Sequence, residues 1–116
     1  MVILYTTLVR FKNGSRSHFN TTLSKELLDE IKSLAKKEET SYNFLLEEGM
    51  AWVLDTYYLK GSFHKPERPA ERVRINTTFN TSLFNRVKAR TKRLGKDLYA
   101  NDLIEEGMKY VIDQRN

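Results

Sequence analysis

Two short stretches of the chain place polar side chains at alternate positions, and these side chains are of types that can hydrogen-bond to the edges of DNA bases. The residues are His18, Asn20 and Thr22 in the first stretch and Arg74, Asn76 and Thr78 in the second. Arginine can donate two hydrogen bonds to guanine, asparagine can pair with adenine, and threonine offers a hydroxyl and a methyl group. The alternative is an exposed polar sheet face that binds nothing, because asparagine and threonine are ordinary surface residues.

The same two stretches are nearly identical in sequence and begin two units of the same plan. Residues 19–23 read FNTTL, and residues 75–79, 56 positions later, read INTTF. A helical pattern follows each stretch and ends in EEGM, at 47–50 and again 58 positions later at 105–108. A self-match in the same order predicts a unit of strand, helix and helix that occurs twice.

Period-two alternation predicts a strand with one polar and one largely apolar face in each unit. The less polar faces consist of Phe19, Thr21 and Leu23 in the first unit and Ile75, Thr77 and Phe79 in the second. Antiparallel pairing of the strands merges these faces over the helices. The predicted fold is therefore mainly α-helical with a short antiparallel β-ribbon, and the two units share one core because each is too small to be stable alone.

Helical periodicity predicts two helices after each strand, at about 25–38, 42–58, 81–94 and 100–114. The predicted N-caps are Ser24, Thr40 or Ser41, and Asn80 or Thr81, and Gly95 is the predicted left-handed stop. Gly49 and Gly107 fall in mid-helix, where glycine costs about 1 kcal/mol relative to alanine. A close crossing of the last helices of the two units explains why both glycines are tolerated.

The unit boundaries follow the repeat. Unit 1 covers residues 16–59 and unit 2 covers residues 73–116. Residues 60–72 hold both prolines and lack an apolar period, so they are predicted to be a linker.

Residues 1–15 precede the repeat. They contain Asn13-Gly14, a strong hairpin signal. Residues 2–11 are therefore expected to pair with residues 16–23 as an extra N-terminal strand; the alternative is a loosely held arm.

Composition excludes several classes of protein. The chain has no cysteine, which removes disulfides and thiolate zinc sites and fits a reducing cytosol. Residues 1–8 are apolar but lack the basic start, the apolar run and the cleavage site of a signal peptide. We expect a cytoplasmic protein with no membrane partner.

Little in the sequence predicts an enzyme. The two histidines, His18 and His64, are far apart, and no glycine-rich phosphate loop is present. The acidic pairs at 47–48 and 105–106 are adjacent in helices, where their side chains point about 100° apart and form no catalytic dyad. No enzymatic activity, cofactor or metal is predicted.

The net charge of +5 is unevenly distributed. Residues 1–58 hold seven basic and eight acidic side chains, whereas residues 59–116 hold thirteen basic and seven acidic side chains. This imbalance favours an acidic partner that approaches the second half, and nucleic acid is the usual one. The alternative is a solvated basic surface without a partner.

The repeated strand, helix and helix resembles the ribbon-helix-helix family of DNA-binding proteins, the Arc, MetJ and CopG type. The resemblance covers about residues 17–58 and 73–115, so that one chain looks like a built-in pseudo-dimer. In that family the two-stranded ribbon enters the major groove of double-stranded DNA. The resemblance implies a sequence-specific transcriptional repressor of a phage or plasmid, nucleoid-associated when bound.

The resemblance also implies which residues touch DNA. Base contacts are expected from His18, Asn20, Thr22, Arg74, Asn76 and Thr78. Phosphate contacts are expected from backbone amides at the start of the second helix of each unit, at Thr40, Ser41 and Tyr42 and at Leu98, Tyr99 and Ala100. Basic side chains that are further phosphate candidates are Arg16, Arg72, Lys88, Lys92 and Lys96. Asp97 is expected to cap the second of these helices and to repel phosphate.

Two further expectations concern partners. Family members often bind adjacent operators cooperatively, so a homodimer or higher assembly on DNA is an expected form. The alternative function is a protein-interaction module, antitoxin-like or binding a host factor, in which residues 1–15 contact the partner protein and the ribbon does not read DNA.

Overall fold

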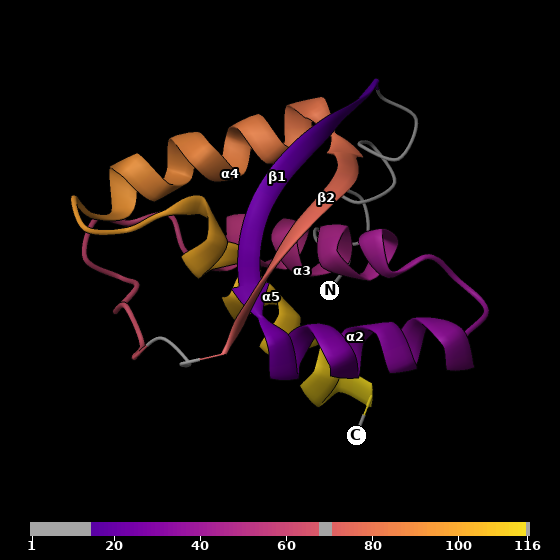
Figure 1. Cartoon of the computed structure of the whole chain (residues 1–116). Coiled ribbons are helices and arrows are strands. Elements are labelled where there is room, and N and C mark those ends of the chain that lie inside the picture. Colours follow the sequence, from indigo (N-terminus) through magenta and orange to yellow (C-terminus); the bar gives the residue numbers. More distant parts are fainter. Residues whose placement is uncertain (1–14, 68–70, 116) are drawn as a thin grey trace.

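A computed structural model of the chain describes residues 15–67 and 71–115, and the predicted extra strand at 2–11 lies outside them. The order strand, helix, helix occurs twice (Figure 1). The elements are β1 (Arg16–Ser24), α2 (Lys25–Lys37), α3 (Tyr42–Thr56), β2 (Arg72–Asn80), α4 (Thr81–Leu94) and α5 (Ala100–Arg115). The fold is mainly helical with a two-stranded antiparallel ribbon, which confirms the predicted fold class.

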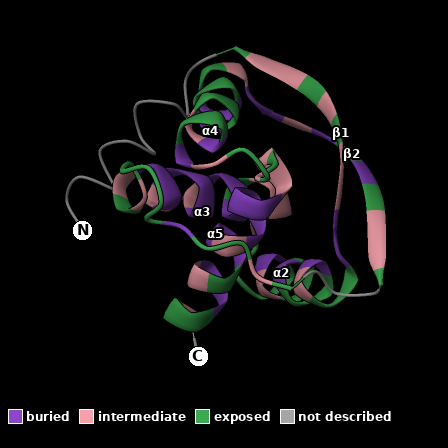
Figure 2. Cartoon of the chain, turned by 90° about the vertical axis from the view of Figure 1, so that its left-hand side faces the viewer, coloured by how far each residue is buried: buried purple, intermediate pink, exposed green. Residues whose placement is uncertain are grey.

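The ribbon forms because two alternating strands pair in a register that is symmetric about their centres. Asn20 lies opposite Asn76, and the pairing extends from Arg16 opposite Asn80 to Ser24 opposite Arg72. The inner face is buried at Leu23, Ile75, Thr77 and Phe79, with Phe19 packed against the same core. Figure 2 shows the ribbon at the edge of the molecule, with exposed residues alternating along each strand.

The helices form the body behind the ribbon. Figure 1 shows α4 on one side of the ribbon and α2 on the other, with α3 and α5 crossing behind it. At the crossing, a Cβ atom built on Gly49 would lie 2.5 Å from the carbonyl carbon and oxygen of Gly107, and the reverse distances are the same. The predicted close crossing is confirmed, and only glycine fits at either position.

The first helix of each half begins at the predicted cap. The Ser24 hydroxyl accepts a hydrogen bond from the Leu27 amide at 3.3 Å, and the Asn80 side chain accepts one from the Leu83 amide at 3.0 Å. These bonds satisfy amides that have no partner within the helix.

The prediction for Gly95 was wrong. Its φ of 178° is extended backbone, whereas a left-handed residue follows the other first helix, α2, at Glu39 with φ of 56°. There the Thr40 amide donates to the Ala35 carbonyl at 2.9 Å, which closes the end of α2. The backbone conformation that follows the first helix therefore differs between the two halves.

The end of α3 is set by a side chain from the other half. Nη1 of Arg90 on α4 donates to the carbonyls of Leu54 and Tyr57, both at 2.7 Å. Helix C-termini leave carbonyls without partners, and this arginine satisfies two such groups. The helix consequently ends at Thr56, two residues before the predicted end. Burial, followed by the nearby Arg86 and Arg93, lowers the pKa of Arg90.

Candidate nucleic-acid interface

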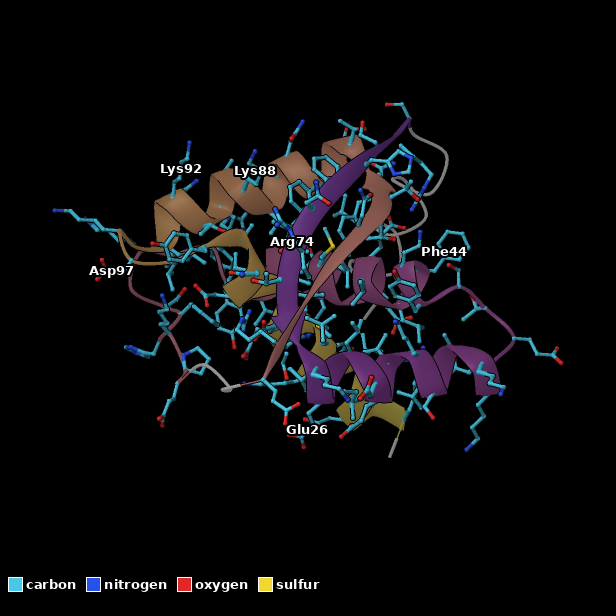
Figure 3. The ribbon with its side chains drawn as sticks, in the orientation of Figure 1. Glu26, Phe44, Arg74, Lys88, Lys92 and Asp97 are labelled. Carbon is cyan, nitrogen blue, oxygen red and sulfur yellow. The ribbon has the colours of Figure 1, made fainter. Side chains whose placement is uncertain are left out.

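The six polar residues predicted to contact bases lie together on the outer face of the ribbon. His18, Asn20, Arg74 and Asn76 are exposed, and Thr22 and Thr78 are partly buried. The register places His18 opposite Thr78, Asn20 opposite Asn76, and Thr22 opposite Arg74. Figure 3 shows Arg74 at the front of the ribbon. A two-stranded ribbon of this kind fits the major groove of B-DNA, about 12 Å wide.

The outer face is asymmetric at its two ends. Arg74 and Thr22 form one end, and His18 and Thr78 form the other. Nδ1 of His18 lies 3.3 Å from Oδ1 of Asn76, so the imidazole contacts one of the two central asparagines. The Arg74 end therefore offers a guanidinium fork, and the His18 end a ring that is already in contact with its neighbour.

Two asparagines that the sequence analysis did not select hold the ribbon threonines in place. Nδ2 of Asn43 donates to the Thr78 carbonyl at 3.0 Å and to its hydroxyl oxygen at 3.2 Å. Nδ2 of Asn101 makes the same two bonds to Thr22, at 3.1 and 3.3 Å. Since each threonine hydroxyl accepts a bond from asparagine, its own proton is available to donate to another acceptor. The signal was present in the sequence, because the asparagines are 58 positions apart, like the EEGM segments.

Arg16 and Arg72, two of the predicted phosphate contacts, form ion pairs at the ends of the ribbon. Nη2 of Arg16 lies 3.0 Å from Oε2 of Glu47 and donates to the Thr78 carbonyl at 3.0 Å. Nη2 of Arg72 lies 2.5 Å from Oε2 of Glu105 and donates to the Thr22 carbonyl at 3.0 Å. Both guanidinium groups thus have structural partners, which orient them along the ribbon.

The two glutamates in these pairs are buried and also join the halves. Glu47 is 3% exposed and accepts a hydrogen bond from the Asn80 amide of the other half at 2.6 Å. Glu105 is 7% exposed and accepts one from the Ser24 amide at 3.2 Å. A buried carboxylate needs both an ion pair and hydrogen bonds to offset its lost hydration. The first glutamate of each EEGM segment therefore has a structural role.

The start of α3 is suited to an anion. Ser41 is the N-cap, but its side chain makes no hydrogen bond to the helix backbone, and its hydroxyl donates to the Asn43 side chain. The first turn contains no acidic residue. Free amides and the positive end of a helix dipole attract phosphate. The Thr40 amide is already bonded to Ala35, which leaves Ser41 and Tyr42 as the backbone candidates here.

The start of α5 is chemically different. The Tyr99 amide, just before the helix, donates to Oδ2 of Asp102 in the first turn at 2.8 Å. Asp97 lies three residues before Ala100, so the prediction that it caps α5 was wrong. Lys65, from the linker, lies 3.7 Å from the same carboxylate oxygen and 4.8 Å from the Tyr99 ring centre. A carboxylate in the first turn opposes phosphate binding, and Lys65 offsets part of its charge.

The other predicted phosphate residues of this half lie nearby. Leu98 is half-buried against the core, Ala100 is the first residue of α5, and Lys96 is exposed. Of these, Lys96 contributes an accessible positive charge at the surface.

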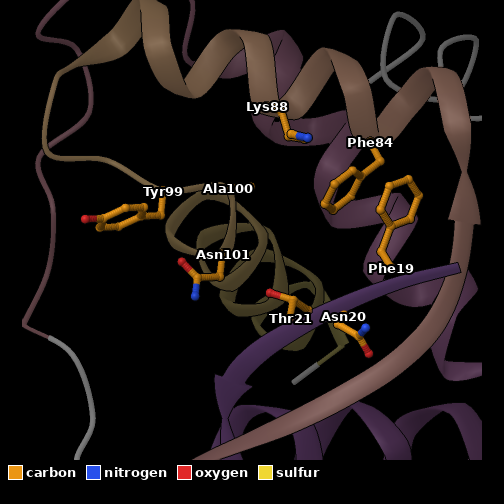
Figure 4. Close-up of a pocket in the computed structure, with 8 residues that line it drawn as sticks. All are labelled: Phe19, Asn20, Thr21, Phe84, Lys88, Tyr99, Ala100 and Asn101. Atoms are coloured by element: carbon orange, nitrogen blue, oxygen red, sulfur yellow. The ribbon is translucent and has the colours of Figure 1, made fainter.

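A cleft lies beside the ribbon between β1, α4 and the start of α5 (Figure 4). It holds about 430 Å³ and is lined by Phe19, Asn20, Thr21, Phe84, Lys88, Tyr99, Ala100 and Asn101. The rings of Phe19 and Phe84 stack with centres 3.9 Å apart and form an apolar wall. The cleft thus joins the outer face of the ribbon to the predicted phosphate residues.

We call this side of the ribbon the α5 flank and define it by Lys88, Lys92, Tyr99, Ala100 and Asn101. The α3 flank is its counterpart in the first half, and its residues are Lys32, Lys36, Ser41, Tyr42 and Asn43. The two sets occupy equivalent positions in the two repeats.

Other kinds of site have little support in residues 15–67 and 71–115. Within these ranges, no group of three or more histidine, aspartate or glutamate side chains is placed to hold a metal ion. None of the helices described has the length and apolar character that crossing a membrane requires. Comparisons with models of known families, with curated proteins and with solved structures find no match.

Proposed function

We propose that this chain binds double-stranded DNA in a sequence-specific manner by placing its β-ribbon in the major groove, as a tandem ribbon-helix-helix protein. The supporting observation is the register of the ribbon, which centres Asn20 against Asn76 and points six polar side chains outward. In this proposal Asn20 and Asn76 read adenine, Arg74 reads guanine, and the threonines donate to acceptors on base edges.

The surroundings of the ribbon provide phosphate contacts in the same proposal. The start of α3 and the lysines of the α5 flank lie on opposite sides of the ribbon, where the two backbones of a major groove would pass. Such contacts set the register and cause the salt dependence, whereas the ribbon residues choose the sequence. The corresponding biological role is a cytoplasmic repressor, nucleoid-associated when bound.

The test is selection of bound sites from random DNA, followed by a salt titration on the selected site. Asn20→Ala/Asn76→Ala should lose about 1–3 kcal/mol of discrimination per asparagine and retain salt-dependent binding to unrelated DNA. Gln114→Ala is the control, because Gln114 is exposed near the end of α5, away from the ribbon. A salt slope near zero with no enriched motif would contradict the proposal and favour a protein-interaction module.

A further inference from the structure

The surface of α4 carries a group of positive charges in addition to the ribbon residues that we propose to contact bases. The helix contains five basic residues, Arg86, Lys88, Arg90, Lys92 and Arg93, and no acidic residue. Arg90 is turned inward to the end of α3, as described above. Lys88 and Lys92 are exposed, one helical turn apart, and Figure 3 shows both along the same side of α4.

The equivalent helix of the first half is nearly neutral. α2 contains four lysines and three carboxylates, Glu26, Asp29 and Glu30, for a net charge of +1. Its Lys25 is paired with Asp29 at 2.8 Å, and this hydrogen bond, followed by the charge of Asp29, raises the pKa of Lys25. Lys32 and Lys36 occupy the places of Lys88 and Lys92, but their helix also carries these carboxylates.

Lys88 is also the cation that lines the cleft. Figure 4 shows it on the wall opposite Thr21 and Asn20, beside the stacked rings of Phe19 and Phe84. Its Nζ lies 5.9 Å from the centre of the Phe84 ring. A cation within about 6 Å of a ring centre is attracted by the face of the ring, which places Lys88 at the edge of the cleft.

We infer that the α5 flank binds the DNA backbone through side chains of α4, with one phosphate at Lys88 in the cleft and the next at Lys92. Lys32 and Lys36 are exposed as well, and Lys32 lies 5.3 Å from the centre of the Tyr42 ring. In this inference their contact with the backbone is the weaker one, because α2 also carries three carboxylates, so the chain holds the two DNA backbones unequally. This inference rests on the proposed function and extends it, because it predicts that the protein binds the DNA backbone more strongly on one side of the ribbon than on the other. Charge complementarity identifies the occupant as the phosphate backbone of the same duplex that the ribbon reads.

The test compares two double variants that remove equal charge from equivalent positions. Lys88→Gln/Lys92→Gln acts on the α5 flank, and Lys32→Gln/Lys36→Gln is the matched control on the α3 flank. Binding to a selected duplex is measured by fluorescence anisotropy between about 50 and 200 mM salt. The first variant should lower the salt slope by about two units and the affinity at 100 mM salt by about tenfold or more, since each phosphate contact contributes about 0.9 to the slope. The control should change the slope by less than about half a unit.

A third variant, Lys88→Arg/Lys92→Arg, keeps the charge and should keep the slope, which separates loss of contact from loss of fold. Equal slope changes in the two glutamine variants would overturn the inference while the ribbon proposal stood. Absence of salt-dependent DNA binding by the unaltered chain would instead overturn both.

Discussion

The α3 flank and the α5 flank occupy equivalent positions in the two halves. They differ in the charge of the neighbouring helix and in whether an acidic residue stands in the first turn of the second helix. At the α3 flank, no acidic residue stands in the first turn of α3, and the adjacent α2 is almost neutral. At the α5 flank, Asp102 occupies the first turn, and the adjacent α4 has only basic charges. One side thus offers backbone dipoles, and the other offers lysine side chains.

Three pairs of contacts that hold the ribbon on the helices show no such divergence. Asn43 and Asn101, Arg16 and Arg72, and Glu47 and Glu105 make the same contacts in both halves. In a symmetric dimer of identical chains, every surface substitution appears on both sides. A single chain that contains both halves is free of that restriction, so its two flanks can differ while these three pairs of contacts stay alike.

The largest expected effect tests whether the two halves are equivalent where α3 and α5 cross. Gly49→Ala and Gly107→Ala should each lower the free energy of unfolding by about 3 kcal/mol, because the new methyl group overlaps backbone that cannot move aside. This loss exceeds the gain of about 1 kcal/mol in helix propensity. Urea denaturation measures both variants. Gly95→Ala is the control, since its methyl group would approach only the flexible Leu98 side chain at 3.3 Å. Clearly unequal losses at Gly49 and Gly107 would show that the halves are not equivalent at the crossing.

A smaller effect is expected from the buried carboxylates. Glu47→Gln and Glu105→Gln should each cost about 2–3 kcal/mol of stability, because they leave an arginine without its counter-charge. The loss should be greater at Glu105, since the Arg72 side chain is 17% exposed and that of Arg16 is 28% exposed. Glu30→Gln, on the exposed surface of α2, provides the control in the same urea denaturation series. No loss in either variant would mean that these ion pairs do not stabilise the ribbon ends.

The difference between the two ends of the ribbon can be removed by one substitution. His18→Arg gives the first strand the residue that the second has at Arg74. Sites selected from random DNA should then have two more similar half-sites, with a change in base preference of about 1–3 kcal/mol at the altered position. Half-sites that remain as different as before would contradict base contact by these residues.

The smallest effect concerns a pair of equivalent positions with different chemistry. Tyr57 donates a hydrogen bond to Glu106 at 2.9 Å, whereas its counterpart Arg115 is paired with Glu48 at 3.0 Å. Burial, followed by the bond to Glu106, raises the pKa of Tyr57 above its ordinary value of 10. The hydrogen bonds from Arg115 to Glu48 and Glu38 raise the pKa of that arginine, so it stays charged at all usable pH values.

The raised pKa gives the sign of the pH dependence. The folded state favours the neutral phenol, so its contribution to stability is complete below pH 10 and is lost as the pH rises through the folded-state pKa. Between pH 9 and about pH 11 the unaltered chain should therefore lose more folding stability than the Tyr57→Phe variant loses. Thermal unfolding of both proteins at pH 9 and about pH 11 measures the difference. Parallel curves would show that Tyr57 does not titrate differently in the folded state.

Periodicity predicted the parts of this molecule that depend on local spacing. The alternation at 18–23 and 74–79 identified both strands and their outer faces, because side chains of a strand point to opposite sides at each step. Ser24 and Asn80 were predictable as caps for the same local reason. Gly49 and Gly107 indicated a crossing, because two mid-helix glycines at the same repeat position need a common cause.

Other features depended on partners far away in the sequence. The end of α3 is set by Arg90, and the phosphate candidates Arg16 and Arg72 are held by Glu47 and Glu105. Neither the contact of Arg90 nor the two ion pairs follow from spacing along one element. The bond from the Tyr99 amide to Asp102 is local, and it differs from the prediction because α5 begins only at Ala100.

By itself, then, the sequence determined that two strands with one polar face each would be followed by paired helices, since these are consequences of residue period. Only the tertiary structure decided which amides remain at each helix start, which arginines are held in ion pairs, and where the cleft lined by Lys88 lies. Those properties arise from contacts between the halves, and contacts between residues 35 to 81 positions apart depend on how the whole chain packs.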